Sequence, residues 1–82
     1  MKKKIEKVLF DLLSKTPFSK AVLGHEIAAT FGSMVGGNIN DYFDDLKIVL
    51  NELEENGFAH TEMLPNGNLR VTKGVDFSSW TP

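Results

Sequence analysis

Side chains that could carry out catalysis or bind a metal are scarce in this sequence of 82 residues. Cysteine is absent, which excludes a thiolate zinc site, a cysteine nucleophile and a disulfide framework. The two histidines, His25 and His60, stand outside HExxH or any comparable metal-binding spacing. The sequence also lacks the glycine motifs of dinucleotide sites, P-loops and nucleophile elbows. We therefore expect a protein that is not an enzyme and that uses no metal and no cofactor.

Acidic side chains gather where the sequence predicts the first turns of its longest helix. They are Asp41, Asp44 and Asp45, and Glu52 follows farther along the same helix. Acids in a first turn complement the helix dipole and stabilise the helix by roughly 0.3–1 kcal/mol each. A partner-facing acidic surface is the second interpretation. A divalent-metal site is the third, but the fixed ligand ladder of a calcium loop is absent.

Basic side chains concentrate at the start of the chain, in Lys2, Lys3, Lys4 and Lys7. Lysines at a helix N-terminus oppose the dipole, so they form either a phosphate-contacting arm or a solvated helix end. Two more cations, Arg70 and Lys73, fall in a predicted hairpin, where Arg70 either reaches a nucleic-acid groove or pairs with Glu62. The formal net charge of −2 does not indicate a dedicated polyanion binder.

Hydrophobic spacing predicts that these residues are positioned by helices. The first helix covers about residues 3–15, and Pro17 ends it because the residue before a proline disfavours the helical region. Phe10 falls off the apolar stripe of this helix and is expected to cover a neighbouring element. The second helix covers about residues 20–31, with Gly32 as its left-handed stop.

The third helix is the longest and covers about residues 40–56. Asn38 or Asn40 caps its start, and Gly57 ends it as the left-handed residue of a Schellman motif. The glycine-rich segment between the second and third helices is expected to be a loop.

A β-hairpin is predicted over about residues 58–73, followed by a tail over residues 74–82. Leu64 to Gly67 suit a type I turn in which glycine forms a left-handed bulge. The register that follows pairs Met63 with Leu69, Glu62 with Arg70, Thr61 with Val71 and His60 with Thr72. In the tail, Phe77 and Trp80 either cover the edge of the core or anchor a homodimer.

The order of these elements resembles the winged-helix family of helix-turn-helix domains. The residues that carry the resemblance are Glu26 to Gly32 (EIAATFG), Leu46 to Phe58 (LKIVLNELEENGF) and the turn Pro65 to Gly67. The resemblance implies an α+β fold over residues 1–82, with three helices followed by a two-stranded β-hairpin. Such domains usually pass from the turn glycine to the third helix within about three residues, whereas Ser33 to Asn38 intervenes here.

Two functions follow from these residues. We expect a non-enzymatic binding module, a small regulator that presents Asp41, Asp44, Asp45 and Glu52 to a partner protein with a basic surface. The alternative is a DNA-binding transcriptional regulator, which the family resemblance implies. It would contact duplex DNA through Lys2, Lys3, Lys4, Lys7, Arg70 and Lys73. No apolar run approaches the ~18 residues of a membrane span, so we expect no membrane contact. The absence of cysteine fits a cytoplasmic protein, which is the location we expect.

Overall fold

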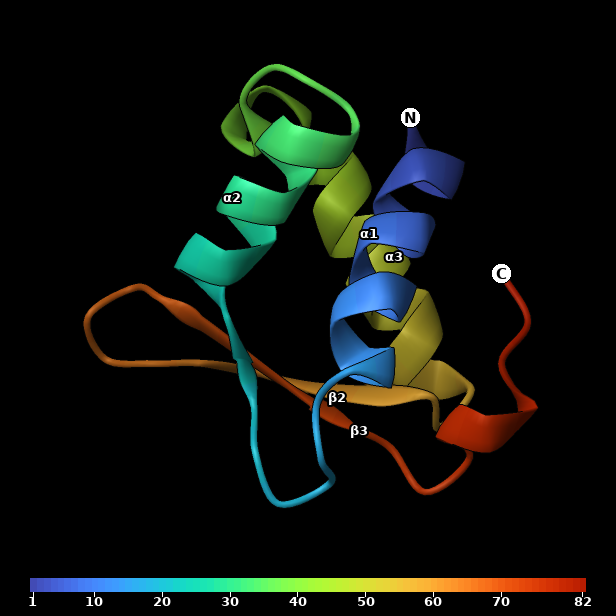
Figure 1. The fold of residues 1–82 in the computed structure, drawn as a ribbon. Coiled ribbons are helices and arrows are strands. Elements are labelled where there is room, and N and C mark those ends of the chain that lie inside the picture. The colour runs from blue at the N-terminus through green and yellow to red at the C-terminus, as the bar shows by residue number, and fades with distance from the viewer.

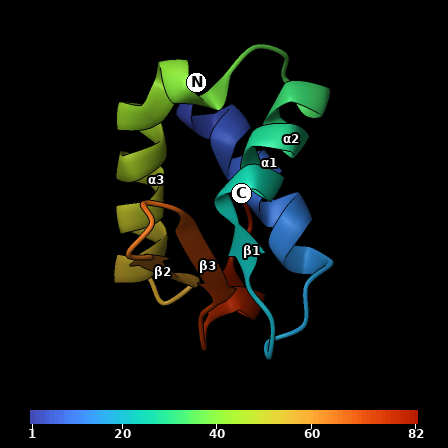
Figure 2. The same cartoon turned by 90° about the vertical axis from the view of Figure 1, so that its left-hand side faces the viewer.

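Three α-helices, a three-stranded antiparallel sheet and two short 3₁₀-helices make up the protein in a computed structural model of residues 1–82 (Figure 1). In chain order the elements are α1 (Lys2–Ser14), β1 (Val22–Leu23), α2 (Gly24–Met34), η1 (Ile39–Tyr42), α3 (Phe43–Glu55), β2 (Ala59–Met63), β3 (Leu69–Lys73) and η2 (Phe77–Ser79). The helices pack against one another, and the sheet lies across one end of them (Figures 1 and 2). The fold is therefore of the α+β class, as expected, but its sheet has one strand more than the predicted hairpin.

The first helix confirms its prediction to within one residue at each end. Its apolar stripe is fully buried, at Ile5, Val8, Leu9 and Leu13. On the solvent side, the ammonium group of Lys15 lies 3.1 Å from the carboxylate of Asp11. The stripe is what fixes α1 against the other helices, because burial of each such side chain contributes about 1.5–3 kcal/mol.

The predicted bounds of the second helix were wrong at both ends. Residues Val22–Leu23 form β1, which pairs with β3, and α2 begins only at Gly24. The carboxylate of Glu26 accepts a hydrogen bond from the Leu23 N–H at 3.2 Å, which caps this start. The helix also continues through Gly32 to Met34, and the first positive φ, +93°, occurs at Gly36.

The third predicted helix is divided in the structure. Its first turn is the 3₁₀-helix η1, and the α-helical part begins at Phe43. The side chain of Asn38 caps η1 by accepting a hydrogen bond from the Asn40 N–H at 2.9 Å. The Schellman end is confirmed, because Gly57 has a φ of +74° and the Phe58 N–H donates to the Leu53 carbonyl at 2.9 Å.

The hairpin has the predicted turn and register. The N–H of Gly67 donates to the Leu64 carbonyl, the N–H of Leu64 donates to the Asn68 carbonyl, and Gly67 has a φ of +86°. All four predicted pairs are present between β2 and β3: Met63–Leu69, Glu62–Arg70, Thr61–Val71 and His60–Thr72. The strand order is β1-β3-β2, so β2 forms one edge of the sheet.

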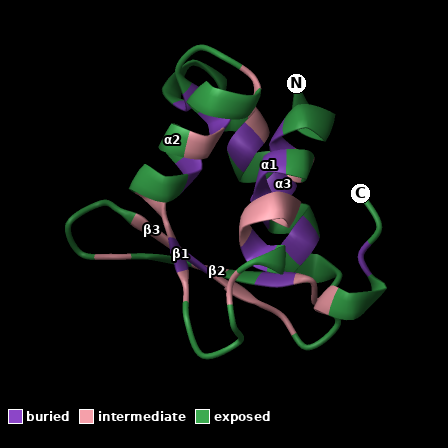
Figure 3. Ribbon diagram, in the orientation of Figure 1, coloured by how far each residue is buried: buried purple, intermediate pink, exposed green.

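The core lies between the helices and the inner face of the sheet. Its 15 buried residues are all hydrophobic and form one cluster, which is seen as the purple inner turns in Figure 3. The tail joins this core through Trp80, whose ring packs against Phe10, Phe58 and Phe77. No helix of the structure combines the length and the apolar character that crossing a membrane requires.

Candidate functional site

The acidic residues singled out in the sequence lie along η1 and α3, and Glu55 follows them on α3. We call Asp41, Asp44, Asp45, Glu52 and Glu55 the acidic face. All are exposed except Asp45, which is half-buried. None of these carboxylates has a basic nitrogen within 4.0 Å, because the ion pairs of the chain involve only Asp11, Glu54 and Glu62. These carboxylates therefore form no ion pair within the chain.

The position of Asp44 and Asp45 also satisfies the helix-dipole interpretation. Both lie in the first turn of α3, and Asp41 lies in the first turn of η1. Together with Asn40, Tyr42 and Phe43 they line a shallow depression of about 360 Å³. No group of three or more histidine, aspartate or glutamate side chains in the structure is arranged to hold a metal ion.

Ile48 stands among the acidic residues and was not singled out in the sequence. It is 43% exposed, although the other aliphatic residues of α3 are buried. Asp44 and Glu52 lie four residues before and after it, so helical geometry places all three on the same side. The sequence contains a sign of this exposure, because Ile48 is an apolar residue at a helical position flanked by acidic residues four positions before and after it. The acidic face therefore has an apolar centre.

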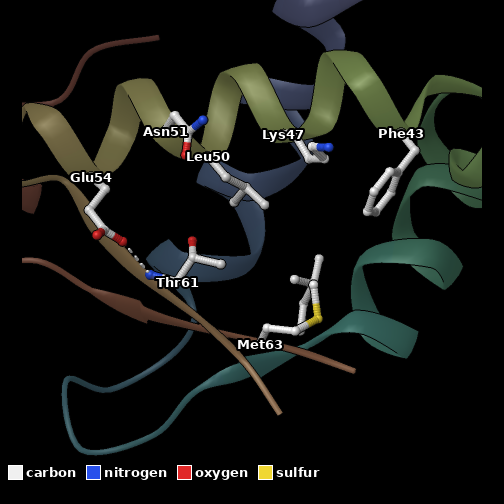
Figure 4. Close-up of a pocket in the computed structure, with 8 residues that line it drawn as sticks. Phe43, Lys47, Leu50, Asn51, Glu54, Thr61 and Met63 are labelled. Carbon is white, nitrogen blue, oxygen red and sulfur yellow. Dashed lines mark hydrogen bonds between the residues drawn. The ribbon is translucent and has the colours of Figure 1, made fainter. Parts of the chain in front are cut away.

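A groove lies between α3 and the hairpin (Figure 4). We call it the α3–β2 groove. It has a volume of about 390 Å³ and is lined by Phe43, Lys47, Leu50, Asn51, Glu54, Thr61, Met63 and Leu69. Phe43 and Met63 face each other at one end, and Glu54 and Thr61 meet at the other (Figure 4). Sequence reasoning missed this groove, because its walls come from separate elements.

Polar groups close one end of the groove. The Oε1 atom of Glu54 accepts a hydrogen bond from the Thr61 N–H at 2.9 Å and lies 3.3 Å from Nδ1 of His60. The hydroxyl oxygen of Thr61 is buried and has no hydrogen-bond partner. Elsewhere on α3, the ammonium group of Lys47 lies 5.5 Å from the centre of the Phe43 ring. The groove thus has mixed walls, to which Phe43, Leu50, Met63 and Leu69 contribute apolar side chains and Lys47, Asn51, Glu54 and Thr61 polar ones.

The basic residues fall into two sets that the structure does not bring together. Lys2, Lys3, Lys4 and Lys7 are exposed at the start of α1, and no carboxylate forms an ion pair with them. This end of α1 lies away from the sheet (Figures 1 and 2). We call these four lysines the lysine arm.

The second basic set lies on β3, and both of its residues contact other side chains of the chain. Arg70 pairs with Glu62 at 3.2 Å, which confirms the cross-strand interpretation of this pair. The ammonium group of Lys73 lies 5.2 Å and 4.8 Å from the ring centres of Phe18 and Phe77. Both cations therefore already have partners within the chain.

The aromatic residues of the tail face their own domain. Trp80 is only 6% exposed, and Phe77 is half-buried in a stack with Phe10 whose ring centres are 5.7 Å apart. In these contacts, both side chains cover the core. A homodimer through the tail stays a prediction.

Comparisons with known proteins add no relative. The chain matches no protein-family model, and no curated protein or solved structure matches it either.

Proposed function

We propose that the chain is a winged-helix domain that acts as a non-enzymatic binding module. The order of elements supports this proposal, because α2 and α3 are followed directly by the β2–β3 hairpin. The pairing of β1 with β3 ties the hairpin to the helices and gives a rigid base for a wing. The intervening residues 35–42 form a loop and a 3₁₀ turn, so α3 begins later than the helix-turn-helix pattern implies.

The acidic face carries the functional part of the proposal. Its carboxylates are unpaired, and they surround the exposed side chain of Ile48. Lysine and arginine side chains of a partner would form charge-assisted hydrogen bonds with these carboxylates, and Ile48 would supply a desolvated centre. A regulator that binds a partner protein with a basic surface is therefore the function that this geometry supports best.

The same face argues against inserting α3 into DNA. A recognition helix contacts base edges with its first turns, and affinity comes largely from cations that neutralise phosphates. The first turn of α3 instead offers Asp44 and Asp45. Bringing these carboxylates close to phosphates would oppose binding, so the acidic face suits a basic protein better.

Charge reversal on the acidic face tests the proposal. The double variant Asp44→Lys/Asp45→Lys is expected to lose capture of the partner protein, because attraction becomes repulsion. Capture is measured by incubating immobilised protein with cell lysate, and then repeated with the purified partner. The matched control is Glu6→Lys/Asp11→Lys on α1, which changes the net charge by the same amount and should leave capture intact. Equal capture by the folded acidic-face variant would contradict the proposal.

DNA binding by the lysine arm is retained as the second candidate, because those four lysines have no ion-pair partner. We expect that replacing Lys2, Lys3 and Lys4 by alanine would then weaken duplex binding and reduce the salt slope by up to about 3. The measurement is fluorescence anisotropy of a labelled mixed-sequence duplex at about 50 and about 200 mM salt. Absence of binding by the folded wild-type protein at the lower salt would exclude this candidate.

A further inference from the structure

Two asparagines of the chain are followed directly by glycine. Asn56 precedes Gly57, and Asn66 precedes Gly67. In such a pair the backbone nitrogen of the glycine can attack the side-chain amide carbon of the asparagine, because glycine has no Cβ atom to hinder the approach. The remaining asparagines precede residues that carry a side chain; they are Asn38, Asn40, Asn51 and Asn68. The sequence alone therefore offers two equivalent candidates for deamidation.

Deamidation is an intramolecular reaction that needs only water. The backbone nitrogen of the glycine loses its proton and forms a bond to Cγ of the asparagine, and the side-chain amide nitrogen leaves as ammonia. Water then adds to one of the two carbonyl carbons of the resulting cyclic imide and opens the ring. Addition at one carbon gives aspartate, and addition at the other gives isoaspartate, whose backbone runs through the former side chain. Both products carry a carboxylate in place of a neutral amide.

The packing around the end of α3 restrains Asn56 and Gly57. The side-chain amide of Asn56 donates a hydrogen bond to the Glu52 carbonyl at 2.8 Å. The Gly57 N–H donates to the Glu54 carbonyl at 3.1 Å, and the Gly57 carbonyl accepts from the Asp76 N–H at 2.9 Å. A Cβ atom built on Gly57 would lie 2.7 Å from the carboxylate of Asp76. Cyclisation here would have to separate the end of α3 from the segment that follows β3.

Asn66 and Gly67 lie instead in the exposed turn of the hairpin, which extends away from the helices (Figure 1). The Gly67 N–H donates to the Leu64 carbonyl at 2.9 Å, and Oδ1 of Asn66 accepts from the Asn68 N–H at 3.1 Å. Both hydrogen bonds connect residues of the turn with one another. A Cβ atom built on Gly67 would meet nothing within 4 Å, so no other segment packs against this glycine.

The two sites therefore differ in the free energy of reaching the reactive conformation. A restrained group in a folded protein reacts from locally opened states, and its rate falls as the free energy of opening rises. At Asn66, opening breaks only the hydrogen bonds of an exposed turn. At Asn56, opening also separates two packed segments of the backbone.

We propose that Asn66 is a site of spontaneous deamidation in the folded protein, whereas Asn56, which has the same sequence neighbour, is protected by its packing. The modification places a carboxylate at the tip of the hairpin, and isoaspartate also lengthens the backbone within the turn. This inference goes beyond the proposed binding function and does not depend on it.

The first test measures both rates in the full-length folded protein, incubated in mildly alkaline buffer. Digestion after glutamate at acidic pH separates the two sites, because Glu62 lies between them, and mass spectrometry then detects the conversion of amide to carboxylate. We expect Asn66 to react at least about tenfold faster than Asn56. Equal rates, a faster rate at Asn56 or no reaction at Asn66 would overturn the proposal.

The same incubation in urea, above the unfolding transition, separates the effect of the fold from that of the sequence. There the two rates should agree within about threefold, because no packing protects Asn56. A difference in urea as large as that in the folded protein would assign the selectivity to the neighbouring residues and overturn the protection by packing.

The second test uses variants. Asn66→Gln should prevent the more acidic species from accumulating in the folded protein, because the longer side chain would have to close a larger and less favourable ring. Ion-exchange chromatography of the intact protein measures this species. Asn56→Gln is the matched control and should leave its accumulation unchanged. Accumulation in folded Asn66→Gln at the wild-type rate would overturn the assignment, as would its loss in Asn56→Gln.

Discussion

Trp80 joins three parts of the molecule through one side chain. The centre of its ring lies 5.1 Å from that of Phe10 in α1 and 5.9 Å from that of Phe58, which follows α3. It also lies 5.9 Å from the ring centre of Phe77 in η2. Aromatic pairs at such separations contribute about 0.5–1.5 kcal/mol beyond the burial of their area. The tail is therefore expected to contribute to stability despite its position near the end of the chain.

Replacing Trp80 by alanine should lower the free energy of unfolding by about 3 kcal/mol, because it leaves a cavity beside three aromatic rings. Urea denaturation followed by circular dichroism measures this loss. The exposed Phe18 provides an aromatic control, and Phe18→Ala should change stability by less than about 1 kcal/mol. If the loss at Trp80 depended on protein concentration, the ring would instead be an anchor of the predicted homodimer.

At the scale of elements, the end of α3 and the end of β3 are held against each other by two glycines. The N–H of Gly74 donates to the carbonyl of Phe58 at 2.9 Å, and the N–H of Asp76 donates to the carbonyl of Gly57 at 2.9 Å. A Cβ atom on Gly74 would overlap the carbonyl oxygen of Gly57. This close approach of two backbones fixes where the helix ends relative to the sheet.

We expect Gly74→Ala to destabilise the protein more than Gly67→Ala. At Gly67, a Cβ atom would meet nothing within 4 Å, so only the positive φ is unfavourable, at a cost of about 1–2 kcal/mol. At Gly74 the backbone itself must move, and the cost should exceed that range. Midpoints of urea denaturation for the two variants compare these effects directly. A smaller loss at Gly74 would show that the two segments separate easily.

At the scale of the whole molecule, one core connects every helix and the sheet. The buried residues come from α1, α2, α3 and all three strands, and they form one cluster that also includes Trp80. The four ion pairs all involve exposed or partly exposed side chains, so each contributes little. Stability therefore depends on hydrophobic burial that all elements share.

A shared core predicts cooperative unfolding of the helices and the tail. The urea transition measured by the fluorescence of Trp80, the only tryptophan, should coincide with the transition measured by far-ultraviolet circular dichroism. The slope should be about 1 kcal/mol per molar urea, the value typical of a small domain. A fluorescence transition at lower urea would mean that the tail opens before the helices unfold.

The sequence alone determined the elements whose signals are local. The apolar period located α1 and most of α3, and the proline–asparagine–glycine turn set the register of β2 and β3. It also located Asp41, Asp44, Asp45 and Glu52 on the third helical segment, where all of them except the half-buried Asp45 are exposed. Local rules suffice there, because each signal acts within a few residues of the structure that it specifies.

Only the tertiary structure decided the features that need residues far apart. Strand β1 has two residues and no alternating pattern of its own, and it exists because it pairs with β3. Gly32 stays inside α2, since a glycine costs a helix only about 1 kcal/mol and packing of the helix outweighs that cost. The α3–β2 groove likewise arises only when the hairpin packs beside α3, because its lining residues come from separate elements, α3 on one side and the hairpin on the other.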